Sequence, residues 1–230
     1  MVKNIVVLTG AGISAESGIN TFRGDDGLWE GHKIEDVCTP QAYESNPSLV
    51  YDFYNKRRSG LLREEIKPNA AHFALAEFEK NFDGNFLLVT QNVDNLHERA
   101  GSQNVLHMHG ELLKARSAGN GVVVDWTDDL DAKSRSDKIG DHILRPHIVW
   151  FGEMPLHMEQ IERSLYECDV FVSIGTSGLV YPAAAFVNWL NPASQSVELN
   201  LDDTPKSLNF DQSIRGKATV IVSEYFESLL

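Results

Sequence analysis

The chain has 230 residues, of which 42% are hydrophobic, enough to bury one large domain or a domain with a smaller lobe. A formal net charge of -13 at pH 7 argues against electrostatic binding to nucleic acid or to an anionic membrane. Its two cysteines, Cys38 and Cys168, have no paired spacing, so we expect neither a disulfide framework nor a cysteine zinc site. With no apolar run of about 18 residues, we expect a soluble, unprocessed, cytoplasmic protein.

Apolar runs rich in β-branched residues alternate with helical patterns along the chain. In chain order, the runs predict strands at 5–8, 86–89, 170–174, 197–201 and 220–222. The helical patterns, several opened by Pro or Asn, predict helices at 47–62, 69–82, 93–99, 155–167 and 182–189. This alternation predicts an α/β fold in which helices cover a parallel sheet.

Two stretches interrupt the alternation. Residues from about 33 to 68 are helical without an obvious strand, and residues from about 113 to 145 are polar. We interpret both as insertions that build a second, smaller lobe.

A glycine-rich turn follows the first predicted strand. Gly10 permits a tight turn, Gly12 lets backbone N–H groups approach a pyrophosphate, and a helix begins near Ser14 with unpaired N–H donors. This pattern predicts a cradle for a dinucleotide, although a glycine pair after a strand also occurs in plain structural turns.

Short polar side chains follow three further strands, at 90–95, 175–178 and 199–201. Ligands of open parallel sheets bind at the carboxyl ends of the strands. The amides, hydroxyls and glycine N–H groups found there are suited to a ribose and a diphosphate.

An ordinary dinucleotide fold places an acidic residue about 20 residues beyond the glycines, at the end of the second strand. Here that strand is missing, and a loop with Phe22, Arg23 and Trp29 takes its place. The loop could cover a bound cofactor or lie on the surface, and hydride transfer is not the obvious chemistry.

Six motifs in a fixed order give the chain a resemblance to a known family. They are Gly-Ala-Gly-Ile-Ser at 10–14, Thr-Phe-Arg at 21–23, Thr-Gln-Asn-Val-Asp at 90–94, His-Gly at 109–110, Phe-Gly-Glu at 151–153 and Gly-Thr-Ser at 175–177. With these motifs the chain resembles the sirtuins, NAD-dependent protein lysine deacylases, from Ile5 to about Val222. It looks like the short bacterial type.

The resemblance implies a Rossmann-like NAD-binding lobe and a small lobe, with NAD and the acyl-lysine entering the cleft between them from opposite sides. The large lobe is expected to comprise 1–32, 84–112 and 146–230, and the small lobe 33–83 and a degenerate zinc module at 113–145.

The implied reaction is an acyl transfer. The acyl oxygen attacks the ribose carbon that bears nicotinamide, and the products are nicotinamide, free lysine and O-acyl-ADP-ribose. By resemblance His109 is the general base, and an imidazole of pKa near 6.5 suits that role. In an extended segment His107 shares its face, so the His-Gly pair of the family selects His109, and we interpret His107 as structural.

The resemblance also assigns the other contacts to NAD. Asn92, with His109 in the catalytic pair, and Asp94 hold the nicotinamide end and the ribose, Gln91 bonds a ribose hydroxyl and Arg23 steadies the phosphates. Asn92 could at the same time cap a helix that begins at Val93. The remaining expected contacts are Gly10, Ala11, Gly12, Ile13, Ser14, Glu16, Thr21, Phe22, Trp29, Gly175, Thr176, Ser177, Asn200, Leu201 and Ala218.

Tyr54 and Arg57 match the Tyr-x-x-Arg pair of sirtuins that accept succinyl- and malonyl-lysine. Three residues apart on a predicted helix, they share one face, while Arg58 faces elsewhere. We expect them to bind the distal carboxylate of the acyl group, and desuccinylation to accompany deacetylation.

The peptide backbone is expected to bind by strand addition between 147–153 and 178–181. The substrate contacts on the first side are Val149, Trp150, Phe151, Gly152 and Glu153.

Most sirtuins hold a structural zinc with four cysteines, which this chain lacks. Ser117, Ser134 and Ser136 stand where the cysteine pairs would lie, and hydroxyls are poor zinc ligands beside thiolates. We therefore expect no zinc, and a small lobe that is held by packing or is mobile. His142 and nearby aspartates have an unconvincing spacing for another metal site.

Three alternatives remain open from the sequence: a protein mono-ADP-ribosyltransferase, a catalytically idle NAD-binding module and a dehydrogenase. We expect acyl-lysine proteins as partners. The sequence does not fix the oligomeric state.

Overall fold

The computed structural model describes residues 2–20, 31–137 and 140–229. Its strands are β1 (Asn4–Thr9), β2 (Asn85–Thr90), β3 (Val105–His107), β4 (Gly110–Ser117), β5 (Val123–Asp125), β6 (Leu144–Ile148), β7 (Val170–Ile174), β8 (Gln195–Asn200) and β9 (Gln212–Arg215). Its α-helices are α1 (Ile34–Val37), α2 (Pro40–Ser45), α3 (Pro47–Leu61), α4 (Ala70–Asn81), α5 (Leu96–Ala100), α6 (Met158–Glu167) and α7 (Ala218–Glu227). Short 3₁₀ helices are η1 (Ala11–Ser17), η2 (Ala183–Trp189) and η3 (Ser207–Asn209). None of the helices within these ranges is long and apolar enough to span a bilayer.

Six parallel strands form the larger sheet, in the order β3-β2-β1-β7-β8-β9. This is the strand order of dinucleotide-binding folds, in which the chain returns after the third strand from the edge to the middle of the sheet. The switch lies between β1 and β7, and a crevice opens outside their carboxyl ends. The predicted α/β fold with a Rossmann-like parallel sheet is therefore confirmed.

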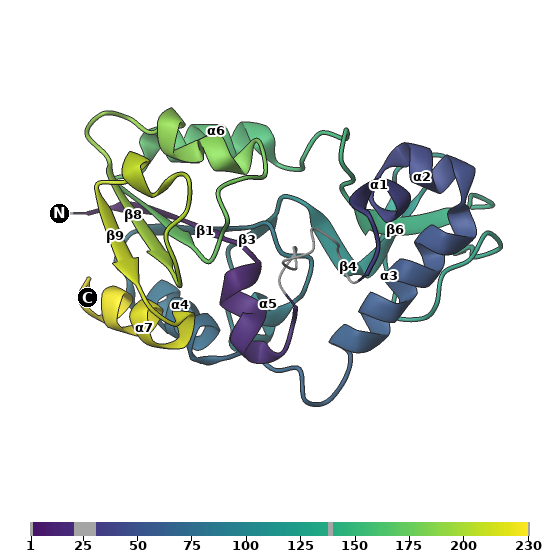
Figure 1. Cartoon of the computed structure of the whole chain (residues 1–230), viewed down its shortest axis with the longest axis horizontal. Coiled ribbons are helices and arrows are strands. Elements are labelled where there is room, and N and C mark those ends of the chain that lie inside the picture. The colour runs from purple at the N-terminus through teal and green to yellow at the C-terminus, as the bar shows by residue number, and fades with distance from the viewer. Residues whose placement is uncertain (1, 21–30, 138–139, 230) are drawn as a thin grey trace.

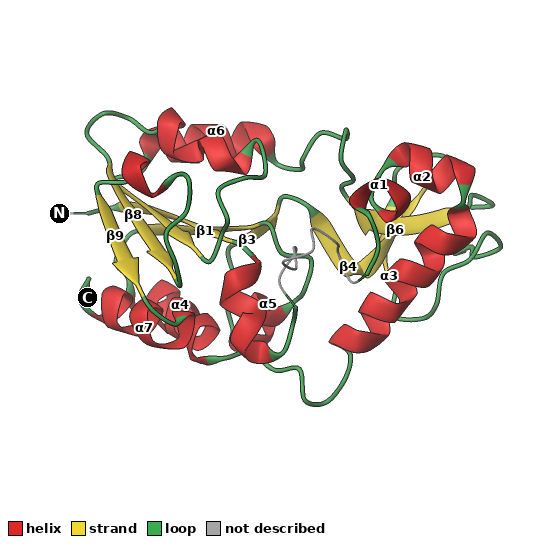
Figure 2. Cartoon of the chain, viewed as in Figure 1, coloured by secondary structure: helices red, strands yellow, loops and turns green. Residues whose placement is uncertain are grey.

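Helices cover both faces of this sheet (Figure 2). On one face α4 and α7 bury Leu75, Phe78 and Phe226 against Val7 and Leu88. On the other face α6 and η2 pack against the side chains that alternate with these. Because both faces are covered, the central strands are predominantly apolar, which allowed them to be predicted from the sequence.

A second, antiparallel sheet, β5-β4-β6, lies away from β8 and β9, with α1, α2 and α3 beside it (Figure 1). Tyr51 of α3 packs with Ala115 and Leu144, and Val50 and Phe53 share a cluster with Trp150. The sequence predicted a smaller unit here but none of its strands, since β4 alternates buried with half-buried residues and β5 has three residues.

Three expectations differ from the structure. Residues 220–222 lie in α7 and not in a strand, because Ala218, Ile221, Val222 and Tyr225 follow a helical period that a three-residue run conceals. The last strand is β9.

Helix α4 lies inside the 33–83 range expected for the small lobe, yet it packs on the parallel sheet. Its buried side chains include Ala71, Leu75 and Phe78, which complete the core beside α7. The helix expected at 93–99 begins only at Leu96.

Candidate active site

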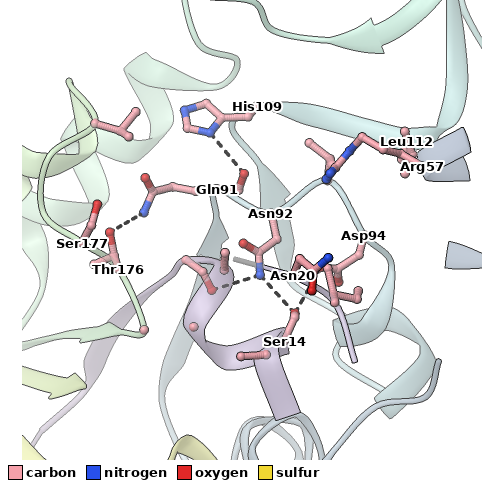
Figure 3. A pocket seen from close by; sticks show the side chains of 18 of the residues that line it. Ser14, Asn20, Arg57, Gln91, Asn92, Asp94, His109, Leu112, Thr176 and Ser177 are labelled. Carbon is pink, nitrogen blue, oxygen red and sulfur yellow. Dashed lines mark hydrogen bonds between the residues drawn. The ribbon is translucent and has the colours of Figure 1, made fainter. Parts of the chain in front are cut away.

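A cavity of about 950 Å³ opens at the carboxyl ends of β1, β2, β7 and β8 and extends to α3 and the segment after β6. Figure 3 shows residues from both glycine turns and from the loop after β2 facing it. The expected cofactor residues Gly10, Ala11, Gly12, Ser14, Glu16, Gln91, Asn92, Asp94, Gly175, Thr176, Ser177, Asn200, Leu201 and Ala218 line it. Ile13 is fully buried beneath it, and Thr21, Phe22, Arg23 and Trp29 lie outside the described residues.

The two glycine turns pack directly on each other. Gly10 N–H donates to Ile174 O (2.9 Å) and Gly12 N–H to Gly175 O (2.8 Å). A Cβ on Gly12 would stand 2.7 Å from the Gly175 Cα, so glycine is required there for contact between the turns. The Gly12 N–H is already bonded within the protein, and the expectation that Gly12 lets backbone N–H groups approach a pyrophosphate stays a prediction.

Asn92 is fixed by side-chain hydrogen bonds at the start of the loop after β2. Its Nδ2 donates to Gly10 O (3.1 Å) and to Ser14 Oγ (3.3 Å), and Ser14 Oγ donates to Asp94 Oδ2 (3.1 Å). The alternative that Asn92 caps a helix at Val93 is wrong, because α5 begins at Leu96 and Asp94 Oδ1 accepts the Leu96 N–H. Burial raises the pKa of Asp94, which is 7% exposed.

Gln91 links the same loop to the turn after β7. Its Nε2 donates to Thr176 Oγ1 (3.1 Å), and Asn200 Nδ2 donates to Thr176 O (2.8 Å). The polar groups that follow β2, β7 and β8 therefore meet at one sheet edge, as the sequence predicted. The Glu16 carboxylate instead accepts hydrogen bonds from the N–H and Oγ–H of Thr219 at the start of α7.

His109 lines the cavity with its ring anchored on one side. Its Nδ1 is 3.1 Å from Gln91 O, a carbonyl that can only accept, so Nδ1 carries the hydrogen and Nε2 is the acceptor of the neutral ring. Burial lowers the pKa of His109. A neutral imidazole with an accepting Nε2 is what a general base requires.

His107 has a different environment from His109. It lies 7% exposed at the end of β3, with Nδ1 3.1 Å from Asn92 O and Nε2 2.6 Å from Glu98 Oε1. The two histidines do not share a strand, because β3 ends at His107 and β4 begins at Gly110. The structure thus distinguishes the two rings.

The segment after β6 forms the opposite wall, with all of Val149, Trp150, Phe151, Gly152 and Glu153 lining the cavity. Several of its N–H groups are bonded internally: Val149 to His109 O, Trp150 to a Glu153 carboxylate oxygen and Phe151 to Cys38 O.

The Glu153 carboxylate of this segment forms ion pairs with two arginines of the small sheet. It accepts bonds from Arg116 (2.9 Å) and Arg145 (2.8 Å). Its carboxylate holds this wall to the small sheet, and its assignment as a substrate contact stays a prediction.

Tyr54 and Arg57 separate in the structure. Arg57 lines the cavity beside Phe53, 5.7 Å from the ring centroid. Tyr54 is fully buried and is not among the described residues that line the cavity. Its hydroxyl donates to Cys38 Sγ (3.4 Å) and accepts from Trp150 Nε1 (3.1 Å), so it supports the wall. Arg58, buried and bonded to Leu112 O, faces elsewhere as expected.

The serines at the expected metal positions are hydrogen-bonded within turns. Ser117 Oγ accepts the N–H groups of Gly119 (3.2 Å) and Asn120 (3.1 Å), and Ser134 Oγ donates to Asp131 Oδ1 (2.8 Å). Such hydroxyls do not suit zinc, which prefers thiolates and imidazoles.

Among the described residues, the one group of potential ligands close enough for an ion is Glu98, His107 and Glu111. Its histidine is already bonded to Glu98, and Lys114 pairs with Glu111.

Sequence reasoning missed some lining residues, including Asn20, His32 and Lys217. A polar residue shortly after the glycine turn was the available indication for Asn20. His32 and Lys217 come from segments whose approach to the cavity depends on the packing of the lobes.

Comparison with known proteins agrees with this geometry. A family model described as Sir2 family matches residues 10–182, and the chain belongs to that family. The resemblance to sirtuins is confirmed.

The relatives include an NAD-dependent protein deacylase of Pasteurella multocida (strain Pm70), 57% identical over 98% of this chain and 97% of its own. One of Escherichia coli (strain K12) is 53% identical over 98% of this chain and 82% of its own.

Solved structures of Sir2 proteins resemble this chain over almost its whole length. A Sir2 homologue in complex with NAD has a TM-score of 0.88 at 39% identity, covering 99% of this chain and 90% of that chain. A Sir2 protein with a p53 peptide and NAD+ has a TM-score of 0.81 at 28% identity, covering 99% and 93%.

Proposed function

We propose that this protein is an NAD-dependent protein lysine deacylase that transfers the acyl group to ADP-ribose. The observation on which this rests is His109, an imidazole with an accepting Nε2 in a cavity lined by both glycine turns and by the Gln91–Asp94 loop. The family and the names of its relatives support the same activity. NAD supplies a ribose carbon from which nicotinamide departs when the acyl oxygen attacks.

The residues that line the cavity have separate roles in this reaction. His109 takes up the proton of a ribose hydroxyl through Nε2, and its Nδ1–H remains on Gln91 O. Asn92 and Asp94 form the end of the cavity assigned to nicotinamide and the ribose. Because burial lowers the pKa of His109, the base stays neutral at pH values somewhat below 6.5, and turnover persists there.

The acyl-lysine enters along the wall formed by residues 149–153. Since the N–H groups of Val149, Trp150 and Phe151 are bonded internally, peptide addition on this side relies on main-chain carbonyls that accept from the peptide. A net charge of -13 favours cationic segments around the modified lysine.

Arg57 gives the site a preference for acidic acyl groups. Its side chain is half-buried on the cavity wall, where a guanidinium can form charge-assisted hydrogen bonds with the carboxylate of a succinyl or malonyl group. Tyr54 contributes by holding Trp150 in place.

The test is incubation with NAD and matched acetyl- and succinyl-lysine peptides, following nicotinamide release and peptide mass. The peptide should lose its acyl group, and His109→Ala should lower turnover by a factor of about 10² to 10⁴. A gain of ADP-ribose mass on the protein substrate would identify a mono-ADP-ribosyltransferase. No nicotinamide release with either peptide would indicate an idle binding module.

Arg57→Met tests the acyl preference. It should lower succinyl-peptide turnover by about tenfold or more and change acetyl-peptide turnover little, because the lost contact is charge-assisted. Lys56→Met, an exposed neighbour that also lines the cavity, is the matched control. If Arg57→Met turns over the succinyl peptide as fast as the wild type does, Arg57 does not bind the acyl carboxylate.

A further inference from the structure

Two histidines hold consecutive main-chain carbonyls of the loop that faces the cavity. His109 Nδ1 is 3.1 Å from Gln91 O, and His107 Nδ1 is 3.1 Å from Asn92 O. The loop is also tied by the Asn92 side chain to Gly10 and Ser14, so its carbonyls and side chains are fixed on opposite sides. His107 lies behind the loop and is not among the described residues that line the cavity.

The partners of His107 determine its charge. Asn92 O is a carbonyl and Glu98 Oε1, at 2.6 Å, belongs to a carboxylate, so both ring nitrogens face acceptors. Donation to both requires an imidazolium. The charged groups around it are Glu98 of α5, Glu111 and Lys114 of β4, and Asp94 of the loop; His97 of α5 also lies near.

Together, these neighbouring groups favour the protonated form of His107. Burial by itself lowers the pKa of His107, but the hydrogen bond to Glu98 and the charges of Glu98 and Glu111 raise it above its usual value. Burial acts to raise the pKa of Glu98, but its hydrogen bond to His107 holds that pKa below the usual value. Both shifts favour a pair in which His107 is protonated and Glu98 is ionised.

We propose that His107, as an imidazolium clamped between Glu98 and the Asn92 carbonyl, is a positioning residue that sets the loop for the nicotinamide end of NAD. It acts through Asn92 and does not touch the substrate. This rests on the proposed function, which places Asn92 at that end of NAD.

Two near-isosteric substitutions separate the two contacts of the ring. The amide nitrogen of His107→Asn can occupy the place of Nδ1 and still donate to Asn92 O, but does not reach Glu98. The amide of His107→Gln can reach Glu98 as Nε2 does, but leaves Asn92 O without its donor. Both variants remove the ring and its charge, so they are controls for each other.

The positioning role predicts that His107→Gln raises KM and Kd for NAD about five- to tenfold, with peptide KM within about twofold of wild type. His107→Asn should recover most of the NAD affinity. Calorimetric titration with NAD measures Kd, and thermal unfolding of both variants monitors the fold. Equal NAD affinity in the two variants, or a rise in peptide KM as large as that for NAD, overturns the proposal.

The charge state has a separate readout that needs no turnover. In ¹⁵N-histidine NMR spectra of the wild type at pH 7.5, the signals lost in His107→Asn should be those of a doubly protonated ring. Glu98→Gln should bring the His107 titration to a lower pH. A neutral His107 ring at pH 7.5 overturns the clamp.

These measurements also separate the two proposals. Absence of nicotinamide release by the wild type contradicts the proposed function, whereas the NMR spectra and the NAD titration still decide the role of His107.

Discussion

The six-stranded and three-stranded sheets border the same cavity but are stabilised by different interactions. In the parallel sheet, β7 is buried along its whole length, and apolar clusters fill both faces. Beside the small sheet, Glu153 is held by Arg116 of β4 and Arg145 of β6, and the Arg145 guanidinium lies 3.4 Å from the Trp150 ring centroid.

Further polar contacts join the small sheet to α3. The hydroxyls of Tyr43 and Tyr51 are 2.6 Å apart, and Tyr51 OH donates to Leu144 O (2.7 Å). Directional polar contacts therefore add to the apolar clusters of the small unit, whereas the large sheet depends mainly on area removed from water.

Truncation in the parallel sheet should have the largest effect on stability. Leu88→Ala, at a fully buried position in β2, should lower the free energy of unfolding by about 3 kcal/mol, because it removes apolar contacts and leaves a cavity. Urea denaturation followed by circular dichroism measures it. Leu62→Ala at an exposed position is the control. A loss below about 1 kcal/mol would contradict the packing account.

Removal of Glu153, the acid that ties the segment after β6 to the small sheet, should have the next largest effect. Glu153→Ala leaves Arg116 and Arg145 without their shared carboxylate and should cost about 2 kcal/mol, since all three side chains are less than a quarter exposed. The exposed pair between Arg163 and Glu167 supplies the control, where Glu167→Ala should cost less than about 1 kcal/mol. Equal losses of unfolding free energy in the two variants would show that the Glu153 network stabilises the fold no more than an exposed ion pair does.

A lower pH should reduce the folding stability of both sheets, because each has a buried neutral histidine within it or beside it. Burial lowers the pKa of His72, behind the parallel sheet, and of His147, in β6, to about 4 each. The unfolded chain, with histidine pKa near 6.5, binds protons between pH 6.5 and 4 that the folded chain does not. Stability should therefore fall as the pH drops through that window, by about 2 kcal/mol per histidine between pH 7 and 5.

Urea unfolding at the two pH values measures this loss. His147→Gln should remove the share of the pH dependence that belongs to the small sheet, while the exposed His142→Gln should not. An unchanged pH dependence in His147→Gln argues against a neutral buried ring.

The smallest effect concerns the turn at the expected metal position. Ser117→Ala leaves the Gly119 and Asn120 N–H groups without their acceptor and should cost about 1 kcal/mol. Because hydroxyls and not thiolates occupy these positions, addition of a chelator should leave the unfolding temperature unchanged. A drop in that temperature on chelation contradicts the metal-free interpretation.

The sequence by itself determined the parallel sheet and the edge where the cavity lies. The runs at 5–8, 86–89 and 170–174 are almost entirely apolar because parallel strands are buried on both faces, and the polar groups after them meet at the carboxyl ends of the strands.

Tertiary structure alone decided which side chains line the cavity. Tyr54 and Arg57 share a helix face, yet only Arg57 lines the cavity, because Cys38 and Trp150 take up the Tyr54 hydroxyl. His107 and His109 are two residues apart, yet one ring pairs with Glu98 while the other lines the cavity. These outcomes depend on partners distant in the chain, and local spacing contains no information about them.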